Sequence, residues 1–199
     1  MNLLTDKLPV KAKIGDKEYP LNTDFRNGIM YFKALKDKDL DAAGKLELLL
    51  KLFFKKVPAD MLSAVKYIFE YYLPGGSPLT KTKKKRSQKN RVIPFCYEKD
   101  HTLIYAAFWQ QYGIDLNGIG MHWFTFKALF DGLAEATYFR QIVNFRQTPI
   151  KDIPKEKRRE FLEAMEELKI IDVNSEETRR SAAEIEKEVT ERFKNGRRT

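Results

Sequence analysis

The sequence predicts a mainly α-helical protein: a multi-helix bundle with a small N-terminal β-hairpin, split by a basic flexible linker. Three observations support this fold class. Apolar residues recur at helical spacing along most of the chain, two short alternating runs flank Gly15-Asp16, and one polar segment is crowded with lysine and arginine. With 199 residues, 43% of them hydrophobic, the chain is long enough to bury a core.

The predicted elements follow one another with short connections. The hairpin is expected at residues 10–21, because Gly15-Asp16 accepts the positive φ of a tight turn. Helices are expected at about residues 24–35, 40–56 and 59–73, then in a segment that ends at Gly113, and then at about 121–133, 137–146, 155–169 and 175–194. Apolar side chains surround most of the helix at 121–133, which is therefore either central or covered by a partner.

A basic cluster at residues 81–91 divides the chain and supplies most of its net charge of +9. It contains almost nothing that could be buried, so we interpret it as a linker. The predicted parts are 1–78 (hairpin and three helices), 79–94 (basic linker), 95–171 (an aromatic-rich helical unit) and 172–199 (a charged C-terminal helix). The alternative is that Lys83, Lys84, Lys85 and Arg86 bind nucleic acid, although the cluster lacks the interleaved aromatic residues that stack on bases.

The sequence contains no pattern typical of an enzyme or a metal site. His101 and His122 lie within helical reach of neither each other nor a cysteine, which argues against zinc. The acidic series at residues 37–41 lacks the glycine and glutamate of a calcium loop, and no glycine-rich phosphate-binding motif is present. Cys96 has no histidine at a readable spacing that could activate its thiol. We therefore expect no catalysis, no metal and no cofactor.

The chain is expected to act in the cytoplasm and away from membranes. Its densest apolar run, residues 46–57, is too short to cross a bilayer and is interrupted by lysines. Asp6 and Lys7 lie where a signal peptide needs a continuous apolar stretch. A single cysteine cannot form an internal disulfide, which suits a reducing compartment.

Aromatic residues are dense between Phe95 and Phe145. Part of this set is expected to form the core, but two of the helices carry more large apolar residues than one packing face usually hides. We therefore predict a partner-binding surface formed by Trp109, Tyr112, Trp123, Phe126 and Phe130. The alternative surface is the thin apolar seam of the C-terminal helix, formed by Ile185, Val189 and Phe193.

Three consecutive motifs resemble a bacteriophage protein family. They are Tyr105-Ala-Ala-Phe-Trp-Gln-Gln-Tyr-Gly-Ile-Asp-Leu116, Met121-His-Trp-Phe-Thr-Phe-Lys-Ala-Leu-Phe-Asp-Gly-Leu133 and Ile142-Val-Asn-Phe-Arg146. With the flanking segments at residues 3–9 and 22–26, they are similar to the bacteriophage "gene product fifteen" family. The resemblance extends over about residues 1–168.

The resemblance implies a tail-assembly chaperone, because members of this family lie beside the gene for the tape-measure protein of siphophages. The implied partners are the tape-measure protein, the tail-tube protein and a companion tail-assembly chaperone, with self-association as a further contact. Such a chaperone acts in the cytoplasm of the bacterial host and is absent from the mature virion. The alternatives are a helical nucleic-acid-binding protein that uses residues 81–91, and a structural tail subunit.

Overall fold

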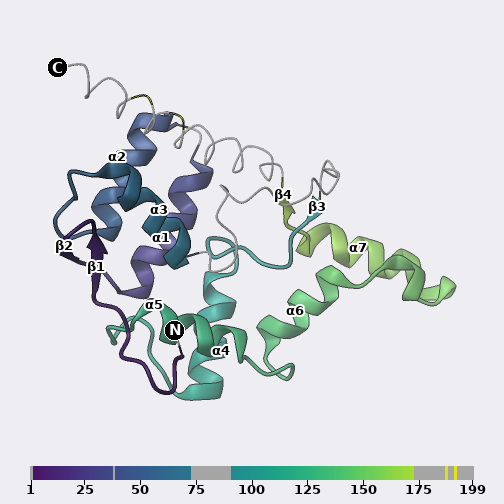
Figure 1. The fold of residues 1–199 in the computed structure, drawn as a ribbon. Helices are drawn as coiled ribbons and strands as arrows, with labels where there is room; N and C mark the ends of the chain where they lie inside the picture. Colours follow the sequence, from purple (N-terminus) through teal and green to yellow (C-terminus); the bar gives the residue numbers. More distant parts are fainter. Residues whose placement is uncertain (1, 38, 73–90, 173–186, 188–190, 192–199) are drawn as a thin grey trace. The chain divides into compact units, whose positions relative to one another are not determined.

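The computed structural model describes residues 2–37, 39–72 and 91–172, together with Lys187 and Glu191 (Figure 1). Over these ranges the chain is mainly helical and begins with a small antiparallel hairpin, which confirms the predicted fold class. Most of the predicted linker at 79–94 and nearly all of the predicted helix at 175–194 lie outside the described residues. None of the helices in the described part is long and apolar enough to cross a membrane.

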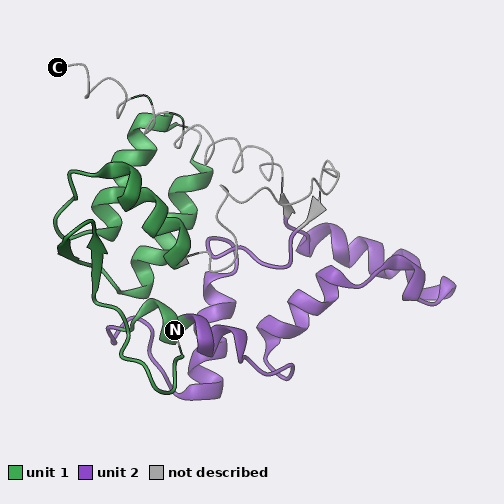
Figure 2. Cartoon of the chain, viewed as in Figure 1, with its two compact units in different colours: residues 1–86, 121–126, 174–199 green, residues 87–120, 127–173 purple. Residues whose placement is uncertain are grey.

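Contacts divide the described residues into two compact units (Figure 2). Unit 1 contains the described residues up to 72 and residues 121–126, and unit 2 contains residues 91–120 and 127–172. The sequence predicted a single unit at 95–171, whereas the contacts group 121–126 with the N-terminal part of the chain. The separation of the predicted ranges by a flexible linker stays a prediction.

The hairpin of unit 1 forms where the alternating pattern predicted it. Strand β1 (Lys11–Ile14) pairs antiparallel with β2 (Lys17–Pro20), and Gly15 adopts a φ of 59° in the turn between them. Glycine takes this conformation without strain because it has no Cβ. Ala12 and Ile14 are buried, so the hairpin turns its alternating apolar residues toward the core.

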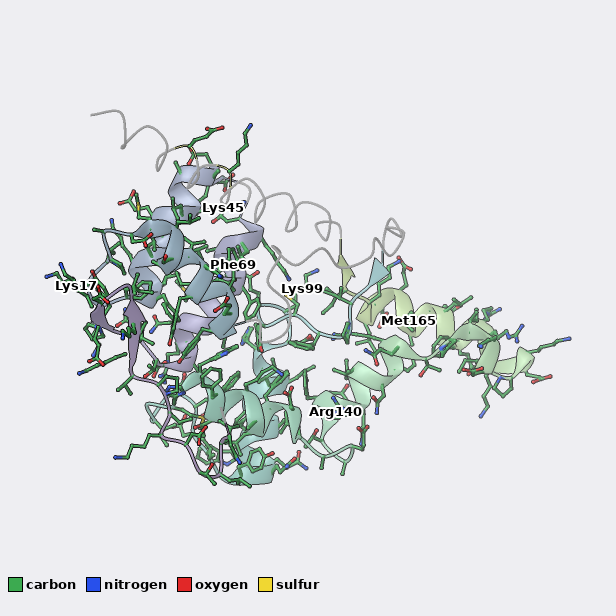
Figure 3. The ribbon with its side chains drawn as sticks, viewed as in Figure 1. Lys17, Lys45, Phe69, Lys99, Arg140 and Met165 are labelled. Atoms are coloured by element: carbon green, nitrogen blue, oxygen red, sulfur yellow. The ribbon has the colours of Figure 1, made fainter. Side chains whose placement is uncertain are left out.

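Three helices complete the main body of unit 1: α1 (Phe25–Lys36), α2 (Ala42–Phe53) and α3 (Met61–Tyr72). Asp24 and Asp41 cap α1 and α2 by accepting hydrogen bonds from backbone amides. The largest buried side chains of this helical cluster are Tyr31, Leu46, Leu49, Phe53, Ile68 and Phe69. Of these, Phe69 is labelled in Figure 3. The predicted helices are confirmed, but α2 ends three residues early because Phe54 is extended and forms a β-bridge with Leu21.

Backbone hydrogen bonds attach residues 121–126 to unit 1. The Phe25 amide donates to the Met121 carbonyl at 2.9 Å, and the Trp123 amide donates to the Thr23 carbonyl at 2.8 Å. The His122 ring accepts the Phe124 N–H at Nδ1 and lies 3.1 Å from the Pro9 carbonyl at Nε2. An Nε2–H tautomer satisfies both contacts. These bonds join segments about a hundred residues apart. They explain why residues 121–126 belong to unit 1 and not to the unit predicted at 95–171.

Unit 2 contains α4 (His101–Tyr112), the second half of α5 (Trp123–Asp131), α6 (Tyr138–Gln147) and α7 (Arg158–Leu168). Two 3-10 turns, η1 (Ile150–Asp152) and η2 (Lys155–Lys157), connect α6 to α7. Strand β3 (Arg91–Val92) pairs antiparallel with β4 (Ile171–Asp172), so the last residues of the predicted linker and the end of the predicted helical unit are joined. Neither strand was predicted.

A buried ion pair holds three segments of unit 2 together. The Arg146 guanidinium on α6 donates Nη1 to Asp100 Oδ2 and Nη2 to Asp100 Oδ1, both at 2.9 Å. The same side chain donates Nε to the Leu168 carbonyl at 2.6 Å and Nη1 to the Pro94 carbonyl at 3.2 Å. Asp100 lies at the start of α4, Pro94 lies before it, and Leu168 is the last residue of α7. By binding all three, Arg146 fixes their relative positions.

Each unit contains a tyrosine whose phenol is kept protonated. Burial raises the pKa of Tyr71 in unit 1 and of Tyr97 in unit 2 well above the ordinary value of 10.0. Tyrosinate is the charged form, so the folded protein retains these protons at a pH at which the unfolded chain has lost them. Stability is therefore unaffected below pH 10 by these groups and falls as the pH rises further.

We expect the ultraviolet absorbance of tyrosinate to rise in two phases as the pH is raised. Tyr71 and Tyr97 contribute to the second phase, because their raised pKa delays ionisation until the helical circular dichroism is lost. Tyr97→Phe should reduce the second phase. Ionisation of Tyr97 in the first phase, with helicity intact, would contradict this prediction.

Candidate functional site

Helix α4 has one side in the core of unit 2 and an aromatic pair on its other side. Ile104, Ala107 and Phe108 are buried, whereas the Trp109 side chain is 54% exposed. Tyr105, one helical turn before Trp109, stacks on the indole with ring centroids 6.4 Å apart and planes 20° apart. We call Tyr105 and Trp109 the aromatic ledge.

The C-terminal end of α4 is held firmly to residues 129–134. The Tyr112 hydroxyl donates to the Leu129 carbonyl at 2.8 Å. The Gln111 side chain donates Nε2 to the Gly132 carbonyl at 3.1 Å and accepts the Ala134 amide at Oε1 at 2.7 Å. Gly113 closes the helix in the left-handed conformation with a φ of 65°. The ledge is therefore carried on a fixed helix, which lowers the entropy lost when a partner binds.

An acidic side chain lies beside the aromatic ledge. The Tyr105 hydroxyl donates to Asp115 Oδ1 at 3.0 Å, and the Asn117 amide donates to the same oxygen at 2.8 Å. The amide of Asn117 and then the Tyr105 hydroxyl lower the pKa of Asp115, and the bond to Asp115 raises the pKa of Tyr105. At neutral pH the surface therefore combines an exposed indole with a fixed carboxylate and a protonated phenol.

The structure divides the five residues predicted to bind a partner. Trp109 is exposed, and the half-buried Tyr112 uses its hydroxyl to anchor α4. Trp123, Phe126 and Phe130 are buried and face the core, so a partner cannot reach them in this conformation. In that respect the structure corrects the predicted surface, and a role of Trp109 and Tyr112 in binding stays a prediction.

Residues distant in sequence provide the packing that the apolar α5 needs. In unit 1 the Phe126 ring stacks on Phe25 with centroids 4.6 Å apart, and the Trp123 indole lies against Gly28. In unit 2 Phe130 packs against Phe95 and Phe139, with centroids 4.9 and 5.4 Å apart. The side of α5 that carries Trp123, Phe126 and Phe130 is therefore covered by this chain itself.

The other predicted residues cannot be placed. Ile185, Val189 and Phe193, and the basic group Lys83, Lys84, Lys85 and Arg86, lie outside the described residues. Within the described ranges, no three histidine, cysteine, aspartate or glutamate side chains form a group that could hold a metal ion. Cys96 is a half-buried free thiol.

Two features of unit 2 were missed from the sequence. Tyr105 lies on the same helical stripe as Trp109 but was not included in the predicted surface. Arg146 lies three and four residues after the buried Val143 and Ile142, on the apolar side of its helix. A charged residue in that position indicates a buried countercharge, although the sequence does not reveal that Asp100 provides it.

Comparison with protein families shows which group the chain belongs to. Residues 4–170 match the family described as Bacteriophage Gp15 protein. The chain belongs to this family. The match covers the hairpin, all of α1 to α7 and the aromatic ledge, so this Gp15-family protein is a bacteriophage protein. Neither the curated proteins nor the solved structures contain a match.

Proposed function

We propose that this Gp15-family protein is a tail-assembly chaperone, which binds the tape-measure protein and helps to recruit tail-tube subunits without catalysing a reaction. The observation that carries the proposal is the family match over residues 4–170. The resemblance to this family implies a gene position beside the tape-measure gene, which points to a role in tail assembly. The chaperone acts in the host cytoplasm, alone or with a companion chaperone, and is absent from the mature virion.

The aromatic ledge supports this function physically. A tape-measure protein is long and mostly amphipathic helix, whose apolar face must be covered before the tail forms. Half-exposed aromatic side chains on a fixed scaffold provide large contact area with little loss of side-chain entropy. The carboxylate of Asp115 beside the ledge favours a client helix with a basic residue next to its apolar stripe.

Trp109→Ala is expected to weaken binding of the tape-measure protein by about tenfold or more, since it removes the largest exposed side chain of the ledge. Co-expression of the two proteins and affinity capture of the complex would measure this loss. Tyr138→Ala is the matched control, because Tyr138 is 61% exposed but lies on α6 of the same unit. It should leave binding unchanged, and both variants should keep their helical circular dichroism.

The results of this experiment distinguish an error in the binding surface from an error in the proposed function. If wild-type protein captures the tape-measure protein and Trp109→Ala captures it equally well, the function stands and the ledge is the wrong surface. If wild-type protein does not bind the tape-measure protein and is found in purified particles, it is a structural tail subunit. Tight nucleic-acid binding at physiological salt that is lost when residues 83–86 become alanine would instead support the nucleic-acid alternative.

A further inference from the structure

Helix α7 presents a large apolar residue that is only half covered by the described part of the chain. None of its side chains is fully buried, and it contacts α6 through Phe161, whose ring lies 4.7 Å from that of Phe145. Leu162 is turned by about 100° from Phe161 and its side chain is 49% exposed at the middle of the helix. Met165, which Figure 3 labels, lies on the next turn of α7 and is half-buried.

The charges of α7 run against its own helix dipole. Lys155, Lys157, Arg158 and Arg159 lie in or just before the first turn, where the acidic residues are Glu156 and Glu160. Glu163, Glu166 and Glu167 follow, and the last turn contains no basic residue. Acidic residues are stabilising near a helix N-terminus and basic ones near a C-terminus, so this order disfavours the isolated helix. A partner with acidic residues beside the N-terminal end of α7 and basic residues beside its C-terminal end would compensate for this unfavourable charge order.

A second copy of α7 in antiparallel orientation places its acidic end beside the basic end of the first copy. Arg159, Leu162 and Glu166 repeat at i, i+3 and i+7 and therefore share one side of the helix. With a two-fold axis between positions 162 and 163, Leu162 meets Leu162 of the partner subunit. Arg159 then lies opposite Glu166 of the partner subunit, and the reverse pair follows by symmetry.

Ion pairs within a single copy do not oppose this arrangement strongly. Arg159 contacts Glu163 at 3.3 Å, and the two side chains are 90% and 67% exposed. Lys169 contacts Glu166, whose side chain is also exposed. Exposed pairs of this kind contribute below about 1 kcal/mol, so exchanging them for pairs between copies is inexpensive.

We propose that α7 is a self-association surface, on which two copies of this chain pair their α7 helices antiparallel through Leu162 and reciprocal pairs between Arg159 and Glu166. The proposal does not depend on the chaperone function, because it needs no client. It uses a different helix from the aromatic ledge, so the ledge is available in a dimer of this kind.

Sedimentation velocity of the full chain over a range of concentrations, at low salt, tests the proposal. Wild-type protein should form a dimer that weakens as salt is added. Leu162→Glu should weaken the dimer by about tenfold or more, because it places like charges on the axis. Glu167→Arg, which reverses a charge on the far side of α7, is the matched control and should leave the dimer unchanged.

Charge reversal gives the sharper measurement. Arg159→Glu and Glu166→Arg should each weaken self-association, since like charges would then face each other across the axis. The double variant should recover it, and an equimolar mixture of the two single variants should form a heterodimer. Because α7 has no fully buried residue, all variants should remain folded by circular dichroism. A monomeric wild type, a dimer insensitive to Leu162→Glu, or failure of the single variants to pair when mixed would overturn the proposal.

Discussion

Arg146→Ala should lower the free energy of unfolding of unit 2 by roughly 3–5 kcal/mol, because it leaves a buried carboxylate without its countercharge. The Arg146 and Asp100 side chains are only 5% and 2% exposed. After the substitution Asp100 retains the Cys96 N–H, but the Leu168 and Pro94 carbonyls lose the donor that the guanidinium supplied. Urea unfolding followed by circular dichroism would measure the change.

The same helix provides the control for this prediction. Arg140 pairs with Glu135 at 2.8 Å, with Glu135 64% exposed, so Arg140→Ala should reduce stability by less than about 1 kcal/mol. Arg146→Lys should have an intermediate effect, since lysine keeps the charge but lacks the planar guanidinium that binds Asp100 in a bidentate way and also reaches the Leu168 and Pro94 carbonyls. Equal effects of Arg140→Ala and Arg146→Ala would show that the buried pair contributes no more than a surface pair.

Trp123→Ala should lower the free energy of unfolding of unit 1 by roughly 3–5 kcal/mol, because it empties a fully buried site. Trp109→Ala should reduce stability by less than about 1 kcal/mol, because about half of that side chain is already exposed. These are the two tryptophans of the chain, so the Trp109→Phe variant makes the fluorescence report on unit 1 alone. Similar losses for both alanine variants would contradict the division into core and surface residues.

A substitution at Gly28, which lies against the Trp123 indole, tests the packing around this tryptophan. A Cβ at position 28 would lie 2.3 Å from Trp123 Cε3 and 2.5 Å from Cζ3, which is too close for either group. Alanine in place of a helical glycine normally stabilises by about 1 kcal/mol, but crowding a packed core costs roughly 1–3 kcal/mol. We expect Gly28→Ala to destabilise unit 1, and less so in a Trp123→Phe background. Stabilisation by Gly28→Ala would show that the indole can move away.

The aromatic set shows where inference from sequence stops. Periodicity places Trp109 and Tyr112 on one stripe of α4 and predicts that some large apolar residues of α4 and α5 are exposed or covered by a partner; Trp109 is 54% exposed. It could not separate Trp123, Phe126 and Phe130 from a binding surface. The residues that cover them, such as Phe25, Gly28 and Phe95, lie far away in the sequence. An all-round apolar helix has the same pattern whether its own chain or a partner covers it.

The sequence by itself determined the hairpin and the positions of α1 to α7, because turn residues, caps and helical spacing act between neighbours along the chain. Only the tertiary structure decided the contacts between distant residues. It ended α2 at Phe53 through the Leu21–Phe54 bridge, and it paired Arg146 with Asp100 across 46 positions. It also formed β3 and β4, which are too short for an alternating pattern. These features depend on which distant surfaces meet, and local spacing contains no information about that choice.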